Sequence, residues 1–188
     1  YAHRRRMPLS NMSRRALMVG VATTFIGCKR LLSRKKGGTK QLTCPAGEHS
    51  IIVPAHWTEG LLKNDEAEIV HGSNLDASFV VVIAEPKDDF SVDLAGYAEI
   101  IADLQREKFE DATFEPLEPR VIHGMQALVR ELRGTLKGLN LVYLSAVVET
   151  PKHFVQIQTW TSKSRFEASR PVLLSVIDSF DVIGPKPN

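Results

Sequence analysis

Residues 126–161 read QALVRELRGTLKGLNLVYLSAVVETPKHFVQIQTWT, and this stretch decides the fold class. It divides into three long segments, at residues 126–135, 139–150 and 152–161, which alternate with short turns. The connections Gly138-Leu139-Asn140 and Thr150-Pro151-Lys152 are short and contain turn residues, which is typical of hairpins. The stretch therefore predicts an antiparallel β-meander.

Shorter strands are expected upstream of this meander. Residues 50–53 and residues 67–71 have the composition of brief extended segments. Residues 79–84 (FVVVIA) form a continuous apolar run, which is typical of a strand that is buried on both faces. Pro116 and Pro119 indicate a loop before the meander. We therefore expect both faces of the sheet to be covered.

Two amphipathic helices are the candidates for that cover. The first has Ser91 as its expected cap and Asp93 in its first turn, and the second has a capping box at Ser164 and Glu167. Their apolar stripes are Leu94, Tyr97, Ala98, Ile101 and Leu104 in the first, and Leu173, Leu174, Ile177 and Phe180 in the second. The sequence therefore predicts an α+β fold, with helices packed on an antiparallel sheet.

The charges are segregated along the chain. The 188 residues are 43% apolar and 24% charged, which fits one domain with a tail. Residues 1–40 contain eleven Lys and Arg and no acidic residue, whereas residues 41–188 contain the other 13 bases and all 22 acidic residues. A nucleic-acid-binding surface needs Lys and Arg clustered on the folded part. We therefore expect one acidic domain, at residues 44–184, that binds no nucleic acid.

The N-terminus has the layout of a bacterial export signal at residues 1–27. Two arginines within residues 13–18 (SRRALM) resemble the twin-arginine motif, without its usual lysine. The uncharged stretch 16–27 suits a signal peptide and is too short to span a membrane. The run Phe25-Ile26-Gly27-Cys28 resembles a lipobox, with Phe25 where Leu is usual. We therefore expect a lipid on Cys28 and a membrane anchor through it.

Two alternatives for this segment stay open: an uncleaved hydrophobic anchor, and an incidental Gly-Cys pair. Residues 28–43 are basic and contain Gly37 and Gly38, which indicates a flexible linker. Its bases would each add about 1 kcal/mol of attraction to an anionic membrane. Residues 185–188 are expected to be a short tail.

Motifs of the common enzyme classes are missing from the sequence. It contains no G-x-S-x-G elbow, no G-x-G-x-x-G loop, no Walker loop and no H-E-x-x-H pair. Asp88 and Asp89 follow a proline and precede a helix, so turn and cap chemistry explains them. Cys44 has no base beside it in a recognised pattern, and we expect a buried or loop residue. The sequence thus predicts no enzyme and no cofactor.

The six histidines are scattered, and none has the i, i+4 spacing of a helical metal site. Across strands, His49 and His56 can meet His71, but isolated histidines near strand ends are more often core or surface residues. We therefore expect no metal site.

Trp57 and Trp160 are the candidate binding aromatics, because such rings supply contact area at low entropic cost. Core packing is the commoner role. In the third meander segment, alternation places Phe154 and Trp160 on the face of Gln156 and Gln158. If that face is open, it forms an aromatic-edged polar patch for a protein partner.

Four stretches carry a family resemblance. They are residues 51–57 (IIVPAHW), residues 79–90 (FVVVIAEPKDDF), the helix with Leu94 and Tyr97, and residues 156–180 with Trp160 and Ser179-Phe180. They resemble the PsbP-like family, most closely its DcrB-type bacterial lipoproteins, over residues 48–182. The resemblance implies an α/β/α sandwich. Members include an accessory subunit of the oxygen-evolving complex, a Ran-binding protein and chaperones for secreted effectors, none of them catalytic.

Three functions follow as hypotheses. The first is a non-enzymatic lipoprotein of the bacterial cell envelope, anchored through Cys28 on the periplasmic or outer side, that acts as an accessory or binding module of a membrane-associated complex. The second is a soluble chaperone-like module that holds an amphipathic or transmembrane helix of a secreted client, and it predicts an exposed apolar groove. The third is a small hydrolase that joins His56, His71 or Cys44 to a carboxylate in one pocket.

Overall fold

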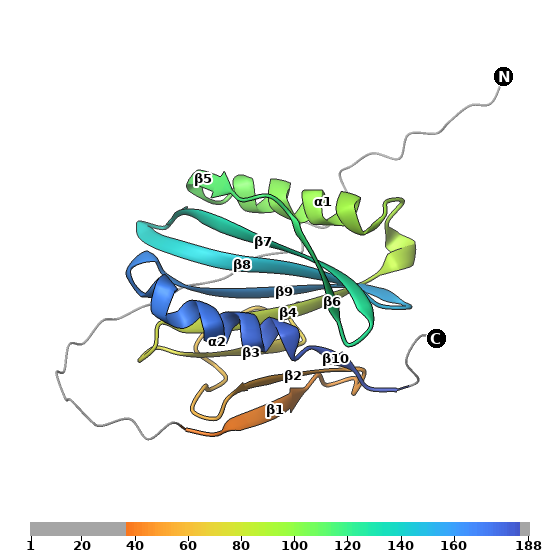
Figure 1. Ribbon diagram of the computed structural model, residues 1–188, viewed down its shortest axis with the longest axis horizontal. Coiled ribbons are helices and arrows are strands. Elements are labelled where there is room, and N and C mark those ends of the chain that lie inside the picture. The colour runs from red at the N-terminus through yellow and green to blue at the C-terminus, as the bar shows by residue number, and fades with distance from the viewer. Residues whose placement is uncertain (1–36, 185–188) are drawn as a thin grey trace.

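Strands dominate the part of the chain that the structure, a computed structural model, describes, residues 37–184 (Figure 1). In chain order the elements are β1 (Thr39–Thr43), β2 (His49–Pro54), β3 (Ile69–Ser73), β4 (Ser78–Pro86), α1 (Leu94–Arg106), β5 (Glu110–Phe114), β6 (Glu118–Ile122), β7 (Met125–Leu136), β8 (Leu139–Glu149), β9 (His153–Ser162), α2 (Phe166–Asp178) and β10 (Asp181–Val182). Short 3₁₀ helices at Lys87–Asp89 and Lys163–Arg165 precede α1 and α2. Neither α-helix of this part is long and apolar enough to cross a membrane.

Seven strands form the main sheet, in the order β3-β4-β9-β8-β7-β5, with β6 also paired to β7. All the pairings are antiparallel. Strands β7, β8 and β9 are the expected meander. The turn between β7 and β8 places Lys137 and Gly138 at positive φ, as a tight two-residue hairpin requires. The predicted α+β fold with an antiparallel meander is confirmed.

Both faces of the main sheet are covered (Figure 1). Helix α1 packs on one face, where Tyr97 meets Phe154 of β9. The other face is covered by α2 and by a second sheet of order β1-β2-β10, with Val155 and Ile157 of β9 in that core. Strand β4 is buried from Ser78 to Ile83, on both faces, as its apolar run predicts.

Aromatic rings stack across the α1 face of the sheet. Phe79, Trp160 and Tyr143 are direct partners on β4, β9 and β8. Their ring centroids are 5.4 Å apart for Phe79 and Trp160, and 4.9 Å apart for Trp160 and Tyr143. Phe109 meets Tyr143 edge-on at 5.2 Å. Each such ring pair adds about 1 kcal/mol beyond the burial of its area, so this stack fixes one end of the sheet.

A hydrogen-bonded polar layer lies beside this stack, beneath α1. The Gln156 amide donates to the Glu85 carboxylate at 2.9 Å and to the Tyr97 hydroxyl at 3.0 Å, and that hydroxyl donates to Glu85. The Gln105 amide donates to Gln158 at 2.9 Å. Burial and the nearby Glu85 carboxylate raise the pKa of Tyr97 far above its usual value. Helix α1 therefore seals both β9 amides from solvent.

The helix starts differ from the predicted ones. Asp93, and not Ser91, caps α1: its carboxylate accepts a main-chain N–H of the first turn at 2.8 Å. The capping box of Ser164 and Glu167 is wrong, because a 3₁₀ turn leads directly into α2. The residue before α2, Arg165, already has helical dihedral angles and makes no side-chain cap. Since no extended residue precedes the helix, a box of this kind cannot close.

Most of the edge strands were not predicted by the sequence pattern; β3, expected at residues 67–71, is the exception. The linker does not extend to residue 43, because residues 39–43 form β1 and pair along β2. Leu42 of this strand packs against the core, but its neighbours in the sequence are polar, so the sequence shows no apolar pattern there. The loop expected around Pro119 contains β6, which lies at an edge of the sheet, where a proline is tolerated. Short strands β5 and β10 were also not expected.

Candidate functional site

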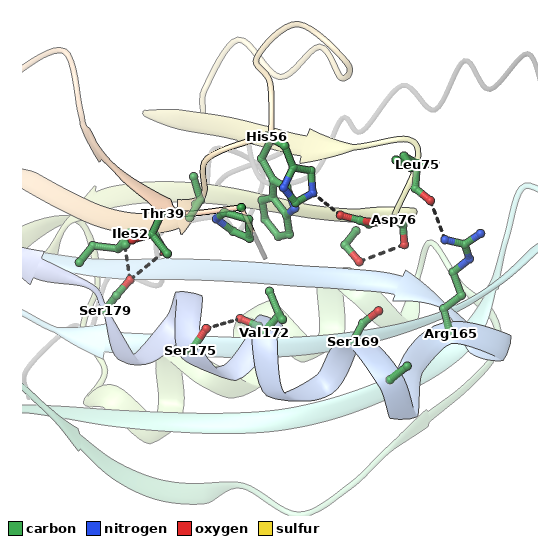
Figure 2. Close-up of a pocket in the computed structure, with 17 residues that line it drawn as sticks. Thr39, Ile52, His56, Leu75, Asp76, Arg165, Ser169, Val172, Ser175 and Ser179 are labelled. Carbon is green, nitrogen blue, oxygen red and sulfur yellow. Dashed lines mark hydrogen bonds and ion pairs between the residues drawn. The ribbon is translucent and has the colours of Figure 1, made fainter. Parts of the chain in front are cut away.

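An open groove runs between α2, the ends of β1 and β2, and the β3–β4 turn (Figure 2). Gly38 and Pro54 contribute from the β1–β2 side, Leu75 from the turn, and Val172 from α2. The cavity volume is about 980 Å³. This is the upper end of the usual range for ligand pockets, about 300–1,000 Å³.

Apolar side chains gather around this groove. Of the six large hydrophobic residues that are exposed among residues 37–184, three line it: Ile52, Leu75 and Val172, at 42%, 72% and 41% exposure. Isolated exposed apolar residues are normal on a soluble domain. Three around one cavity are not scattered, and such a concentration marks an interaction surface.

The α2 wall of the groove is built from small residues. Ala168, Val172, Ser175 and Ser179 recur at spacings of three and four and therefore share one helix face. The Ser175 hydroxyl donates to the Val172 carbonyl at 2.8 Å, and the Ser179 hydroxyl donates to the Val176 carbonyl at 2.7 Å. The Ser179 hydroxyl also accepts the Ile52 main-chain N–H of β2 at 2.8 Å. Because both hydroxyls already have partners within the fold, this wall demands no polar partner and lets another backbone approach closely.

Polar groups at the turn end of the groove are paired with one another (Figure 2). His56 Nε2 is hydrogen-bonded to the Asp76 carboxylate, and the Arg165 guanidinium donates to the Leu75 carbonyl at 2.6 Å. A His–Asp pair also occurs in hydrolases, where the imidazole in turn contacts a nucleophile. Here the Ser78 hydroxyl donates to the Asp76 main-chain carbonyl at 3.2 Å and not to the imidazole.

The structure separates the three histidines that were considered as metal ligands. His56 lies at the groove, and His71 lies in β3, where its Nδ1 is buried without a hydrogen-bond partner among the described residues. Burial, and the nearby Lys40 charge, lower the pKa of His71. His49 begins β2 and lies elsewhere again. The three histidines therefore form no common metal cluster among the described residues, whereas His56 does meet a carboxylate, that of Asp76, at the groove.

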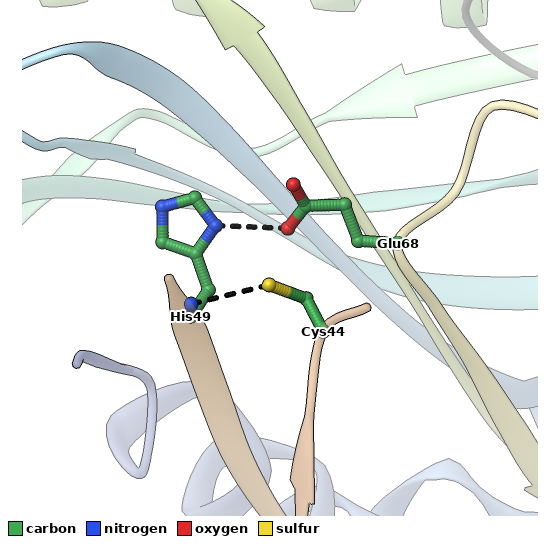
Figure 3. A group of neighbouring side chains, drawn as sticks. All are labelled: Cys44, His49 and Glu68. Carbon is green, nitrogen blue, oxygen red and sulfur yellow. Dashed lines mark hydrogen bonds and ion pairs between the residues drawn. The ribbon is translucent and has the colours of Figure 1, made fainter. Parts of the chain in front are cut away.

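Cys44 and His49 instead meet Glu68 at the turn end of the β1–β2 hairpin (Figure 3). His49 Nδ1 lies 2.8 Å from the Glu68 carboxylate, and the His49 main-chain N–H donates to Cys44 Sγ at 3.2 Å. Cys44 follows β1 and is buried, as expected for it. Sequence reasoning missed this cluster, because Glu68 is remote in sequence and only the packing of the β1-β2-β10 sheet on the main sheet brings it near.

The candidate binding aromatics lie in the core. Trp57, Phe154 and Trp160 are each at most 2% exposed. The interpretation of Phe154 to Trp160 as an open aromatic face is therefore wrong: Phe154 packs beneath α1, Trp160 stacks between Phe79 and Tyr143, and Gln156 and Gln158 find their partners beneath α1. Trp57 lies in the core on the opposite face of the sheet, where it also lines the groove.

The remaining site predictions fall outside the groove. Cys28 and the twin arginines lie outside the described residues, as does the tail at residues 185–188. Asp88 and Asp89 form a 3₁₀ turn, in line with their interpretation as turn residues. The groove residues Leu75 and Val172 were not predicted. The one available signal was a leucine in a polar turn, between Asn74 and Asp76.

Comparisons with known proteins identify the fold of this chain. No protein-family model and no curated protein matches the chain. The solution structure of cyanobacterial PsbP from Synechocystis sp. PCC 6803 does match, with a TM-score of 0.58 at 16% identity, over 81% of this chain and 99% of that one. The fold is PsbP-like. The sandwich implied by the sequence resemblance is thus confirmed.

Two further solved structures share the PsbP-like fold. LpqN of Mycobacterium tuberculosis, described as involved in cell envelope biogenesis, matches with a TM-score of 0.55 at 12% identity, over 78% of this chain and 91% of that one. A Pseudomonas aeruginosa protein of unknown function, described as a putative regulator, has a TM-score of 0.51 at 11% identity, over 81% of this chain and 100% of that one. At such identities the likeness shows the fold alone.

Proposed function

We propose that this protein is a non-enzymatic accessory module of a bacterial cell envelope and binds a partner protein through the groove between α2 and β2. The observation that carries this proposal is the concentration of exposed apolar side chains around that groove. Its location is supported by LpqN, a structural neighbour described as involved in cell envelope biogenesis, and by the export-signal pattern at residues 1–27.

The chemistry of the groove selects its occupant. The small α2 wall favours a segment that packs its backbone closely, and the exposed Ile52, Leu75 and Val172 favour an apolar face. Residues 41–188 contain 22 acidic and 13 basic residues, so long-range attraction favours a basic segment. The occupant that fits is a basic amphipathic helix of a membrane-associated protein.

Site-specific cross-linking tests whether the groove has such a partner. A photo-reactive amino acid at Leu75, which is 72% exposed in the groove, is expected to give a cross-linked protein in the envelope fraction of cells. The matched control places the same probe at Val121, which is 66% exposed on β6 outside the groove. The Leu75 product should disappear when Val172→Asp is added to the chain. Identical products from both positions, or none from Leu75, would contradict the proposal.

Anchoring through Cys28 belongs to the same proposal. The expected mature species begins at Cys28 and is heavier by a diacylglyceryl group and an acyl chain, because an acylated cysteine follows the cleavage site in a lipobox. Intact mass measurement of protein extracted from membranes detects this, and the Cys28→Ala variant should lack the added mass. An unmodified soluble species from the unaltered chain would rule out the DcrB-type lipoprotein assignment.

The groove also favours a second candidate, the chaperone-like module that holds a helix of a secreted client. Both functions use the same apolar surface. They differ in the protein that is bound and in whether the domain is anchored to a membrane. A client-holder would be unmodified at Cys28, would remain soluble, and would cross-link from Leu75 to newly made secreted proteins. An accessory module would cross-link to one resident membrane-associated protein.

A further inference from the structure

The hairpin cluster of Cys44, His49 and Glu68 takes no part in the groove and has the chemistry of a metal site (Figure 3). One potential ligand atom of each residue, the thiol sulfur, an imidazole nitrogen and a carboxylate oxygen, lies within 4.8 Å of the other two. Figure 3 shows the three side chains pointing toward one another from the residue after β1, the start of β2 and the residue before β3. Three different ligand types therefore converge from segments that are separate in the chain.

The local backbone holds these ligands in place. The Cys44 main-chain N–H donates to the His49 carbonyl at 2.9 Å, and the Gly47 N–H donates to the Cys44 carbonyl at 2.9 Å. Gly47 has φ of +74°, which lets the turn between Cys44 and His49 close. The His49 ring packs against the Phe180 ring, with centroids 5.6 Å apart. These contacts therefore fix the positions of Cys44 and His49 before any metal binds.

We propose that Cys44, His49 and Glu68 bind one zinc ion. A sulfur, nitrogen and oxygen donor set suits zinc, whereas calcium and magnesium take oxygen ligands. Cys44 and His49 are 3% and 1% exposed, while the Glu68 side chain is 23% exposed and offers the path of entry. A second cluster, of Glu48, His49 and His153, shares His49 with the first.

Binding changes the protonation of the cluster. Zinc binds the thiolate of Cys44, so the thiol proton leaves for solvent when the metal binds. Nδ1 of neutral His49 must present its lone pair to the metal, so the ring proton resides on Nε2. The hydrogen bond between His49 and Glu68, at 2.8 Å, opens to admit the ion. One proton is therefore released for each zinc bound, and affinity rises with pH.

Cobalt and zinc titration of the reduced, chelator-treated full chain tests the site. Cobalt is expected to bind with a stoichiometry of one and to give a thiolate-to-metal charge-transfer band in the near ultraviolet. Competition with a chromogenic chelator then measures zinc affinity. Cys44→Ser should abolish the band and weaken zinc binding by about 100-fold or more, because the thiolate is the strongest ligand.

The chain offers a matched control. Its only other cysteine is Cys28, so Cys28→Ser should keep the band and the affinity. Glu68→Gln removes one charged ligand at nearly constant volume, and should weaken zinc binding by about tenfold while the band remains. If circular dichroism shows that Cys44→Ser does not fold, the zinc affinity of Glu68→Gln tests the proposal in its place. No band with the unaltered chain, a band that Cys28→Ser removes, or unchanged affinity in Glu68→Gln would overturn the proposal.

Discussion

Replacing Gly72 by alanine is expected to destabilise the fold by about 3 kcal/mol, as overpacking of a tightly filled core does. A Cβ at this buried β3 position would lie 2.3 Å from a ring carbon of Phe79 and 2.9 Å from the Ser78 carbonyl oxygen. The Phe79 ring cannot easily move away, because it is stacked on Trp160, which is stacked on Tyr143. Gly72 also exchanges two main-chain hydrogen bonds with Thr58, which resist a shift of the strand.

Urea denaturation measures this change in the free energy of unfolding. The control is Gly37→Ala, where a Cβ meets no atom within 4 Å, and its effect should stay within about 0.5 kcal/mol. Adding Phe79→Leu to Gly72→Ala should recover part of the loss, since the smaller side chain removes the clash. A Gly72→Ala protein as stable as the unaltered chain would mean that the aromatic stack is not packed as described.

The sheet was predictable because its signals are local. The β7–β9 meander consists of three long segments joined by recognisable short turns, and the continuous apolar run at Phe79–Ile83 fits a strand that is buried on both faces. Edge strands carry weaker signals, since one side meets solvent and needs few apolar residues. Strand β1 has only Leu42 in contact with the core, and β6 contains a proline.

The polar face of β9 shows why pattern alone misplaced the binding surface. Gln156 and Gln158 alternate with Val155, Ile157 and Thr159, which in a sequence indicates a half-exposed strand. Their burial depends on Tyr97 and Gln105, which α1 brings from more than 50 residues away in the chain. Such pairing is a tertiary effect that no periodicity reveals.

The groove was equally hidden from the sequence. Its walls come from β2, the β3–β4 turn and α2, and none of these contributes an unusual motif. Val172 reads as one more apolar residue near the α2 stripe, yet it is 41% exposed, whereas Leu173 is fully buried. Consecutive side chains of a helix point about 100° apart. An error of one residue in the predicted buried face therefore hides an exposed residue such as Val172.

Substitution of Val172 by aspartate is expected to weaken binding of a basic amphipathic peptide by about 30-fold, or about 2 kcal/mol. The peptide contains leucine, alanine and lysine in helical periodicity and stands in for the proposed partner segment. The new carboxylate must be desolvated against the apolar face of the peptide, between Ile52 and Leu75. Val121→Asp adds the same charge outside the groove, so the comparison cancels general attraction between the acidic domain and the basic peptide.

The decisive measurement is the affinity of this peptide for the unaltered chain, Val172→Asp and Val121→Asp, obtained by fluorescence anisotropy beside a scrambled peptide of identical composition. We expect the amphipathic peptide, and not the scrambled one, to bind tightly to the unaltered chain and to Val121→Asp, and to lose binding in Val172→Asp. Equal affinity for the two peptides, or equal weakening by the two substitutions, would contradict the assignment of the groove between α2 and β2 as the partner-binding surface.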